Sequence, residues 1–369
     1  MGHIKIGAFI AAKRKERGLT QEELASYLGV SKPAVSKWES GQSYPDIVLL
    51  PVLAAFFNTS VDALLGYEAQ LSKQEIKALY KKLSARFATE PFETVMAECR
   101  DYVKKYHACW NLLYAVSLLY TNHAMLGGSS DAAEAVLHEA AALLERVETE
   151  SGEATLAKEA LSLRAYCYLA TGRAAEAIDL LGDADTHALP IDPLLAKAYM
   201  LKGDTDRAKE LLQRFIYTSG VTVIAAMPDL MLLYADTPNK LDACLLIAAL
   251  IGDAFELRKT QPHHYFALYL TAAALFAALG AVEKALDILE DYVGIVTDET
   301  IYPLKLRGSA FFDRIEPYFD TLRLGNMAPR SETLIKKDLK DAVICNPAFD
   351  GLKTLDRFRA LAERLGRLE

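Results

Sequence analysis

The sequence is poor in the residues that mark secreted, fibrous and low-complexity proteins. Its 369 residues include five cysteines with no CxxC pair, 20 glycines and 13 prolines. Scattered cysteines in an odd number make no disulfide framework and are typical of a reducing compartment. The low glycine and proline contents exclude collagen-like and linker-dominated chains. Because the first residues show neither an apolar signal core nor a myristoylation motif, we expect a cytoplasmic protein.

The sequence also lacks the motifs of common catalytic sites, since GxGxxG, GxxxxGK[ST], HExxH and GxSxG are all missing. His107 and Cys109 supply both kinds of metal ligand, but a metal site needs three or four convergent groups. His263 and His264 are adjacent, so they point in different directions on a helix. We therefore expect no enzyme activity, no metal and no cofactor.

One long uncharged run raises the question of a membrane span. Tyr265–Val282 has 18 residues without a charge, which is the borderline length for crossing a bilayer. The run is rich in alanine and is followed by an amphipathic stretch. We therefore expect a buried helix of a helical array and no membrane partner.

The charge is divided unevenly along the chain. The net charge is −8, yet residues 1–66 hold seven Lys or Arg against six Asp or Glu. A small, locally basic head on a large acidic body is compatible with a DNA-binding module that carries a sensor.

Apolar residues recur at spacings of three and four almost throughout, which predicts an all-α fold. Short helices broken by glycine and proline give way to longer ones rich in alanine, leucine and tyrosine. We place the boundary at a short linker, residues 67–71, between a head of residues 1–66 and a helical domain of residues 72–369.

Residues 19–41, LTQEELASYLGVSKPAVSKWESG, predict two short helices joined by a tight turn. Thr20 and Glu23 form a capping box at the start of the first helix. Gly29 can end that helix in the left-handed conformation. Ser31 is then placed to cap the second helix.

The second helix divides into a core face and an exposed face. Val35 and Trp38 face the core, and Pro33 is tolerated because the first turn leaves its N–H groups unbonded. The exposed face carries side chains suited to bases and phosphates in the major groove, namely Lys32, Pro33, Ser36 and Lys37.

This stretch resembles the Cro/repressor class of helix-turn-helix domains, the xenobiotic-response-element family, over residues 4–66. The resemblance implies a five-helix domain that binds near-palindromic double-stranded DNA as a homodimer. It also implies an ion pair between Arg14 and Glu39, which link the first and third helices in similar domains. The positions that it assigns to DNA contact are Gln21, Ser31, Lys32, Pro33, Ser36, Lys37, Ser43 and Tyr44, with Lys13 and Lys15 as phosphate candidates.

A pattern Gly-x₄-Ala-x₃-Leu recurs in the rest of the chain, starting at Gly128, Gly172, Gly203 and Gly280. It predicts repeated units of a helix, a glycine turn and a second helix. The pattern resembles the tetratricopeptide repeat, most clearly over residues 110–300. We expect helical pairs over 73–107 and 300–365 to extend the array, with a C-terminal cap over 300–369.

The repeat resemblance implies an α-solenoid whose concave face binds peptides or protein segments. In similar arrays the position after each small residue of the first helix faces that side. This register nominates Asn122, Tyr166 and Lys197 as residues of an effector groove.

A helix-turn-helix head on such an array is similar to the peptide-pheromone regulators of Gram-positive bacteria, the RRNPP group. We therefore expect a sequence-specific transcriptional regulator whose helical-repeat domain mediates dimerisation and binds a peptide or protein effector. The alternative is an intracellular scaffold or adaptor whose array binds another regulator, with DNA binding secondary.

Overall fold

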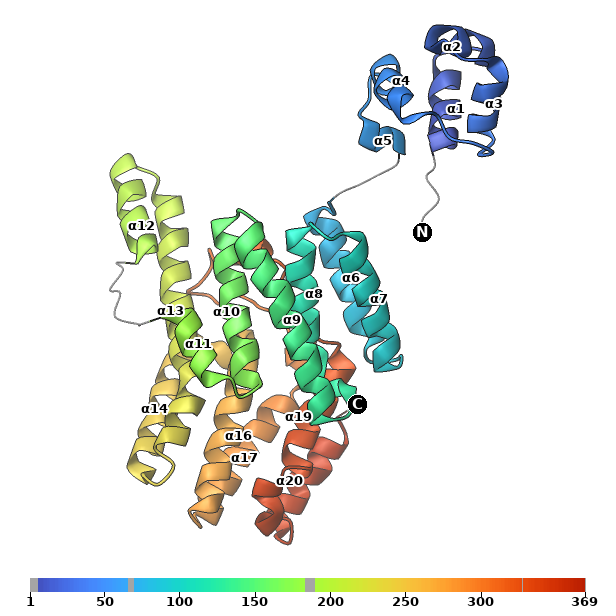
Figure 1. The fold of residues 1–369 in the computed structure, drawn as a ribbon. Helices are drawn as coiled ribbons and strands as arrows, with labels where there is room; N and C mark the ends of the chain where they lie inside the picture. The colour runs from blue at the N-terminus through green and yellow to red at the C-terminus, as the bar shows by residue number, and fades with distance from the viewer. Residues whose placement is uncertain (1–5, 66–69, 183–189, 327, 369) are drawn as a thin grey trace. The chain divides into compact units, whose positions relative to one another are not determined.

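The computed structural model describes residues 6–65, 70–182, 190–326 and 328–368. The chain divides into two compact units, Met1–Ser72 with Tyr106–Cys109 and the remainder. Both units are built from helices, so the all-α prediction is confirmed (Figure 1). Residues 67–69 of the expected linker lie outside the described residues.

The described residues of the first unit form a small bundle of five α-helices and one 3-10 turn. These are α1 (Ile6–Glu16), α2 (Gln21–Leu28), α3 (Lys32–Glu39), η1 (Ile47–Leu49), α4 (Leu50–Phe57) and α5 (Val61–Leu65). All five α-helices contribute to one core of Ile6, Ile10, Leu24, Ala25, Leu28, Val35, Trp38, Leu53, Phe57 and Leu64.

The predicted turn between α2 and α3 is confirmed. The Thr20 hydroxyl accepts a hydrogen bond from the Glu23 N–H, and the Glu23 carboxylate accepts one from the Thr20 N–H. Gly29 ends α2 with φ 68°, a conformation that glycine adopts without steric cost. Ser31 occupies the N-cap position of α3, but its side chain makes no capping hydrogen bond, which corrects the role expected for it.

A close approach between α1 and α3 depends on Gly7. A Cβ atom at this position would lie 1.9 Å from the carbonyl oxygen of Trp38. Any larger residue would therefore push α3 away from α1. Because Trp38 is in the buried core, this contact positions the second helix of the motif.

The second unit is a series of helical hairpins followed by an irregular stretch and a final helical pair (Figure 1). Its hairpin helices are α6 (Lys73–Arg86), α7 (Phe92–Lys105), α8 (Trp110–His123), α9 (Ser130–Glu150), α10 (Ala154–Ala170), α11 (Ala174–Leu181), α12 (Ile191–Lys202), α13 (Thr205–Leu233), α14 (Pro238–Ala254), α15 (Leu257–Thr260), α16 (His263–Ala278) and α17 (Val282–Val296). The remaining elements are η2 (Ala124–Gly127), η3 (Glu299–Ile301), α18 (Glu316–Thr321), α19 (Glu332–Ile344), η4 (Pro347–Leu352) and α20 (Asp356–Gly366).

The predicted repeat register is confirmed at its turns. Each pattern glycine lies between the two helices of a hairpin and has positive φ, from 73° to 84°, at Gly128, Gly172, Gly203 and Gly280. The alanine five residues later is at most 4% exposed in every repeat, at Ala133, Ala177, Ala208 and Ala285. Small residues therefore lie where the paired helices meet.

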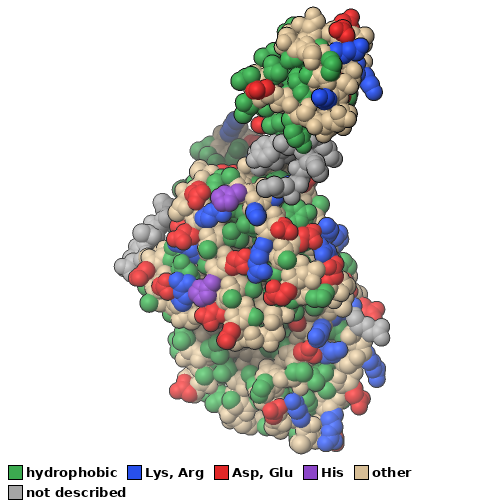
Figure 2. Space-filling view, turned by 45° about the vertical axis from the view of Figure 1, so that its right-hand side comes forward, with side chains coloured by type: hydrophobic (Ala, Val, Ile, Leu, Met, Phe, Trp, Pro, Cys, Tyr) green, Lys and Arg blue, Asp and Glu red, His purple; other side chains and the backbone are tan. Residues whose placement is uncertain are grey.

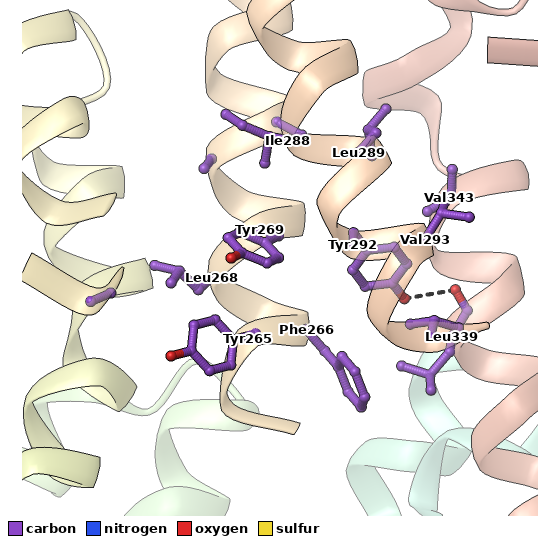
Figure 3. Packing of buried hydrophobic residues seen from close by; sticks show 14 of the residues in the cluster. Tyr265, Phe266, Leu268, Tyr269, Ile288, Leu289, Tyr292, Val293, Leu339 and Val343 are labelled. Atoms are coloured by element: carbon purple, nitrogen blue, oxygen red, sulfur yellow. Dashed lines mark hydrogen bonds between the residues drawn. The ribbon is translucent and has the colours of Figure 1, made fainter. Parts of the chain in front are cut away.

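The run that raised the membrane question packs into the array through one face, since Tyr265, Tyr269 and Phe276 are buried while Leu279 is 40% exposed. Its charge-free residues form α16 and the turn into α17, and the faces of both helices pack against α19 (Figure 3). The Tyr292 hydroxyl of α17 donates a 2.7 Å hydrogen bond to the Leu339 carbonyl of α19. Among the described helices, α13 alone is long and apolar enough to cross a membrane by length and composition. Gln213 and Arg214 of α13, however, bond to residues elsewhere in the unit.

Residues 302–331, here called the crossing segment, differ from the expected helical pair over 300–365. Apart from the short α18, the described residues of this segment form no α-helix, because they lack the apolar spacing that a long helix needs. They run across the helices from α13 to α6 (Figure 1). Within the described part of this region, α19 and α20 make the one helical pair.

Side chains at both ends of the crossing segment hold it against the hairpins. Near its start, Phe312 is fully buried and its ring lies 5.0 Å from that of Tyr217 in α13. Near its end, the Pro329 carbonyl accepts hydrogen bonds from Tyr80 and Ser84 of α6 at 3.1 and 2.8 Å.

Candidate nucleic-acid interface and effector face

The end of α3 is tied to α1 and α2 by a buried ionic group. The Arg14 guanidinium donates to the Glu39 carboxylate through Nε at 2.6 Å and Nη2 at 2.9 Å. The Gln21 amide donates to the same carboxylate at 2.8 Å. The Arg14 and Glu39 side chains are 11% and 9% exposed. The expected ion pair is therefore confirmed, and its two parallel bonds fix the angle of α3.

The same contacts determine the electrostatics of this group. Hydrogen bonding to Arg14 lowers the pKa of Glu39 below its usual value, and hydrogen bonding to Glu39 raises the pKa of Arg14. Arg14 also donates to the Leu19 carbonyl at 2.5 Å. Each of the three nitrogens of the Arg14 guanidinium therefore donates to a group inside the head.

The opposite face of α3 is exposed, as the pattern predicted. Lys32, Pro33, Ser36 and Lys37 all lie at the surface, while Val35 and Trp38 are buried. A short helix anchored from behind, with polar side chains at its exposed N-terminal end, has the shape that enters a major groove.

Two of the nominated lysines carry weak internal ion pairs. Lys32 Nζ lies 3.4 Å from Glu22, and Lys13 Nζ lies 2.8 Å from Glu16. Exposed pairs of this kind contribute about 0–1 kcal/mol, so a phosphate could replace either carboxylate at little cost. For Lys37 no ion pair is found among the residues that the structure describes.

The remaining DNA candidates flank α3. Lys15 is exposed at the end of α1, and Ser43 and Tyr44 lie in the loop after α3, with Tyr44 exposed. The next element brings a feature that the sequence analysis missed. Ile47 and Val48 of η1 are 77% and 70% exposed. Consecutive apolar residues beside a helix break are the signal that could have identified this surface.

Two of the nominated effector residues lie on helix faces that the crossing segment touches. Arg323 of that segment bonds to Asn111 on α8 and to Glu159 on α10. Asn122 follows Asn111 by eleven residues and Tyr166 follows Glu159 by seven, which are whole numbers of turns at about 3.6 residues each. The face expected to receive a peptide thus already carries part of the chain itself.

The three effector candidates differ in their surroundings. Asn122 is half-buried and donates to the Leu118 carbonyl at 2.7 Å. Tyr166 is 54% exposed. Lys197 is exposed on α12, which packs along α13, and no hydrogen bond or ion pair is found for it within the described ranges. Asn122 on α8 and Tyr166 on α10 lie on neighbouring helices, whereas no hydrogen bond or ion pair joins Lys197 to the described residues of the crossing segment.

The histidines and cysteines form no metal-ligand group within the described residues. Partial burial lowers the pKa of His264 to about 4, so its ring is neutral near pH 7. Burial also raises the pKa of the Cys167 thiol to about 11, which makes it a poor nucleophile.

Comparison with known proteins finds relatives of the first unit. Residues 10–64 match the family described as Helix-turn-helix. The chain is 42% identical over 72 residues to the HTH-type transcriptional activator BcrR of Enterococcus faecalis, which is 19% of this chain and 35% of that protein. It is 36% identical over 70 residues to the ImmF control region 10 kDa protein of Bacillus phage phi105, covering 19% of this chain and 78% of that protein.

A third relative is the cryptic phage CTXphi transcriptional repressor RstR of Vibrio cholerae, at 32% identity over 80 residues, 22% of this chain and 71% of that protein. The chain spans about a third of the length of BcrR. A solved structure of Bacillus thuringiensis PlcR in complex with the peptide PapR7 and DNA covers 79% of this chain and 95% of that one, at 16% identity and a TM-score of 0.29. A likeness this loose carries no argument about ligands.

Proposed function

Because the chain belongs to the helix-turn-helix family through its first unit, we propose that it is a sequence-specific DNA-binding transcriptional regulator of the bacterial cytoplasm. Its helical-repeat unit mediates dimerisation and binds a peptide or protein effector. The observation that carries the proposal is the exposed face of α3, held from behind by the buried Arg14–Glu39 pair.

DNA contact follows from the arrangement around α3. Lys32, Pro33, Ser36 and Lys37 enter the major groove, where lysine can read guanine. Gln21, Ser31, Ser43 and Tyr44 contact the backbone around them, and Lys13 and Lys15 of α1 contact phosphates. A near-palindromic operator is then read by two copies of α3 about 34 Å apart, one turn of DNA.

Dimerisation is assigned to the second unit because the head is small. Helices α11 to α14 carry most of the large exposed hydrophobic side chains of that unit, here called the apolar edge: Ile178, Leu181, Ile191, Leu194, Leu195, Met200, Leu201, Ile216, Val223, Leu230, Leu232, Leu233, Leu246, Ile247 and Leu250. Because α12 and α14 both pack against α13, these side chains lie on neighbouring helices, and exposed apolar patches of this kind mark interaction surfaces.

The hairpin of α12 and the start of α13 has too small a core to stand by itself. Its buried cluster consists of Ala196, Ala208 and Leu211 only, and Ala196 is the single buried residue of α12. Because an isolated pair of short helices is marginal in water, this hairpin needs further burial of its apolar side chains. The same apolar surface on a second copy of the chain would provide that burial.

Effector binding is assigned to the face of α8 and α10 that includes Asn122 and Tyr166, here called the inner face, with Lys197 beyond it on α12. An amide can bind a peptide backbone through one donor and one acceptor, and a tyrosine offers apolar area with a polar tip. A peptide or protein segment on this face would share it with the crossing segment or displace that segment. The alternative, a scaffold that binds another regulator, uses the same face.

The test of DNA reading is selection from a pool of random duplexes, followed by a shift assay at several salt concentrations. Affinity that falls steeply with salt and a selected near-palindrome are expected. The double variant Lys32→Ala/Lys37→Ala should lose preference for the selected site.

The matched control is Lys209→Ala/Lys337→Ala, which removes the same charge from exposed positions of the second unit. It should bind as the wild type does. Unchanged operator binding by the Lys32/Lys37 variant would overturn the assignment of α3 as the DNA-reading helix. If the wild type selects no DNA at any salt concentration, the result would favour the alternative function, a scaffold that binds another regulator.

A further inference from the structure

A cavity of about 420 Å³ lies between α6 and the chain around the start of α19. Its apolar walls come from both sides, Ala78, Tyr80 and Ala85 on α6 facing Leu304, Leu324 and Ile335. A second cavity of about 320 Å³ shares Leu304 and Ile335 with it. Binding sites for small molecules typically have volumes of about 300–1,000 Å³ and walls of this kind.

The charged groups around the first cavity are predominantly positive. Lys77, Lys81 and Arg330 line it, against the single carboxylate of Glu332. That carboxylate is already paired with Lys336 at 2.9 Å. Over the face seen in Figure 2, by contrast, basic and acidic side chains of this unit are interspersed. The cavity therefore favours an anion.

Arg330 points to the same kind of ligand. Its guanidinium forms an ion pair with Asp338 through Nη1. Its Nε is buried and has no hydrogen-bond partner within the described residues. A buried donor without a partner costs about 1–3 kcal/mol. Because the Nε atom is itself covered, a carboxylate oxygen would satisfy it once the Arg330 side chain turned toward the cavity.

The start of α19 adds to this potential. Ser331, the N-cap of that 13-residue helix, lines the cavity next to Arg330. The Ser331 hydroxyl accepts a hydrogen bond from the Leu334 N–H, and the dipole and remaining N–H groups of a helix N-terminus favour a negative charge. The guanidinium, the helix start and the two lysines all favour a negative charge beside an apolar chamber.

We infer that this cavity binds a small apolar monocarboxylate, with the carboxylate at Arg330 and Lys81 and the apolar body against Tyr80, Leu304 and Ile335. The inference goes beyond the proposed function, whose effector is a peptide or protein segment, because it assigns a small-molecule ligand to a separate cavity of the same unit. The bound molecule would join α6, the first helix of the unit, to the crossing segment and α19.

The probes are octanoate, which has an aliphatic body, and 4-phenylbutyrate, which has an aromatic one. Each acid is compared with its neutral amide. Binding to the full chain is measured by calorimetry, and thermal shift serves as a second readout. At least one acid should bind, and its amide should bind at least tenfold more weakly, because the amide lacks the charge that Arg330 and Lys81 would attract.

Three variants locate the site. Lys81→Gln removes an exposed cation and should weaken binding of the acid several-fold, while Lys82→Gln on the next position of α6 is the matched control. Lys82 pairs with Glu98 and does not line the cavity. Ala78→Trp fills the chamber without changing a charge and should abolish binding of both acid and amide.

Equal affinity for acid and amide, no binding of either acid at millimolar concentration, or unchanged binding by both Lys81→Gln and Ala78→Trp overturns the inference. The same preparations are assayed for salt-dependent DNA binding. If the wild type binds DNA but neither acid, only the inference about this cavity is wrong. If the wild type selects no DNA sequence, the proposed regulator function is wrong.

Discussion

Glu39 is the residue on which the geometry of the head depends most. Its carboxylate accepts from Arg14 and Gln21, so it joins α1, α2 and α3 at one point. Glu39→Ala leaves the Arg14 guanidinium buried without its partner, and we expect a loss of about 3–5 kcal/mol in the unfolding free energy of the head. Denaturant unfolding followed by Trp38 fluorescence in a Trp110→Phe background measures it, since the chain has two tryptophans.

The control is Glu16→Ala, which removes an exposed partner of Lys13 and should change little. A Glu39→Ala head as stable as the wild type would mean that the pair serves orientation and not stability.

The pH dependence of the head follows from the same contact. Because hydrogen bonding to Arg14 lowers the pKa of Glu39 in the folded state, the pair stabilises the fold fully above the ordinary value of 4.5. This stability is lost as pH falls through the lower folded pKa. Acid titration of head stability should therefore be shallower in Glu39→Gln than in the wild type.

Gly7 lets α1 approach α3 closely because it has no side chain. A Cβ would meet the Trp38 carbonyl at 1.9 Å, so Gly7→Ala should destabilise the head by about 1–3 kcal/mol through overpacking. Gly294 of α17 is the matched helical glycine, with nothing within 4 Å of an added Cβ. Gly294→Ala should instead be neutral or stabilise its unit by up to about 1 kcal/mol. Denaturant unfolding of both variants measures these two changes in unfolding free energy, and equal changes would contradict the role of Gly7.

At the scale of elements, the crossing segment is held by aromatic packing. Phe312 is fully buried against Tyr217 and Phe255, while the adjacent Phe311 is 64% exposed. Phe312→Ala should cost about 3–5 kcal/mol and expose residues around 309–325 to hydrogen exchange and protease. Phe311→Ala should alter neither, and equal protection in the two variants would show that polar contacts alone hold the segment.

Those elements differ in how far they can be predicted from sequence. The α2–α3 turn and the hairpin turns are local, because a capping box, Gly29 and the repeated glycines specify them within a few residues. The crossing segment has no such period, and its partners lie far along the chain, so neither its path nor its occupation of the inner face could be predicted. Gly7 was missed because a glycine inside a helical pattern gives no indication of its neighbour.

For the whole molecule, the apolar edge is the feature with the widest consequence. Leu201 on α12 is 92% exposed and Leu233 on α13 is 80% exposed. If a second copy covers them, the double variant Leu201→Glu/Leu233→Glu should shift the chain from dimer to monomer in analytical ultracentrifugation, because two buried charges without partners would be costly.

Met125→Glu serves as the control, since Met125 is 81% exposed but lies on η2, outside the apolar edge. Its oligomeric state should match that of the wild type. A monomeric wild type, or a dimer that persists in the Leu201/Leu233 variant, would contradict the assignment of this surface. The monomeric variant should also bind a half-site and the full operator with equal affinity.

The crossing segment also bears on how the second unit folds. In a simple solenoid each hairpin touches only its neighbours, so the array can unravel from either end. Here Ser84 of the first hairpin is bonded to Pro329, 245 positions away in the chain. Such distant closure slows folding, but it couples the first hairpin to residues that follow the last one. The unit should consequently unfold in a single cooperative step, without the end-fraying intermediates of an open array.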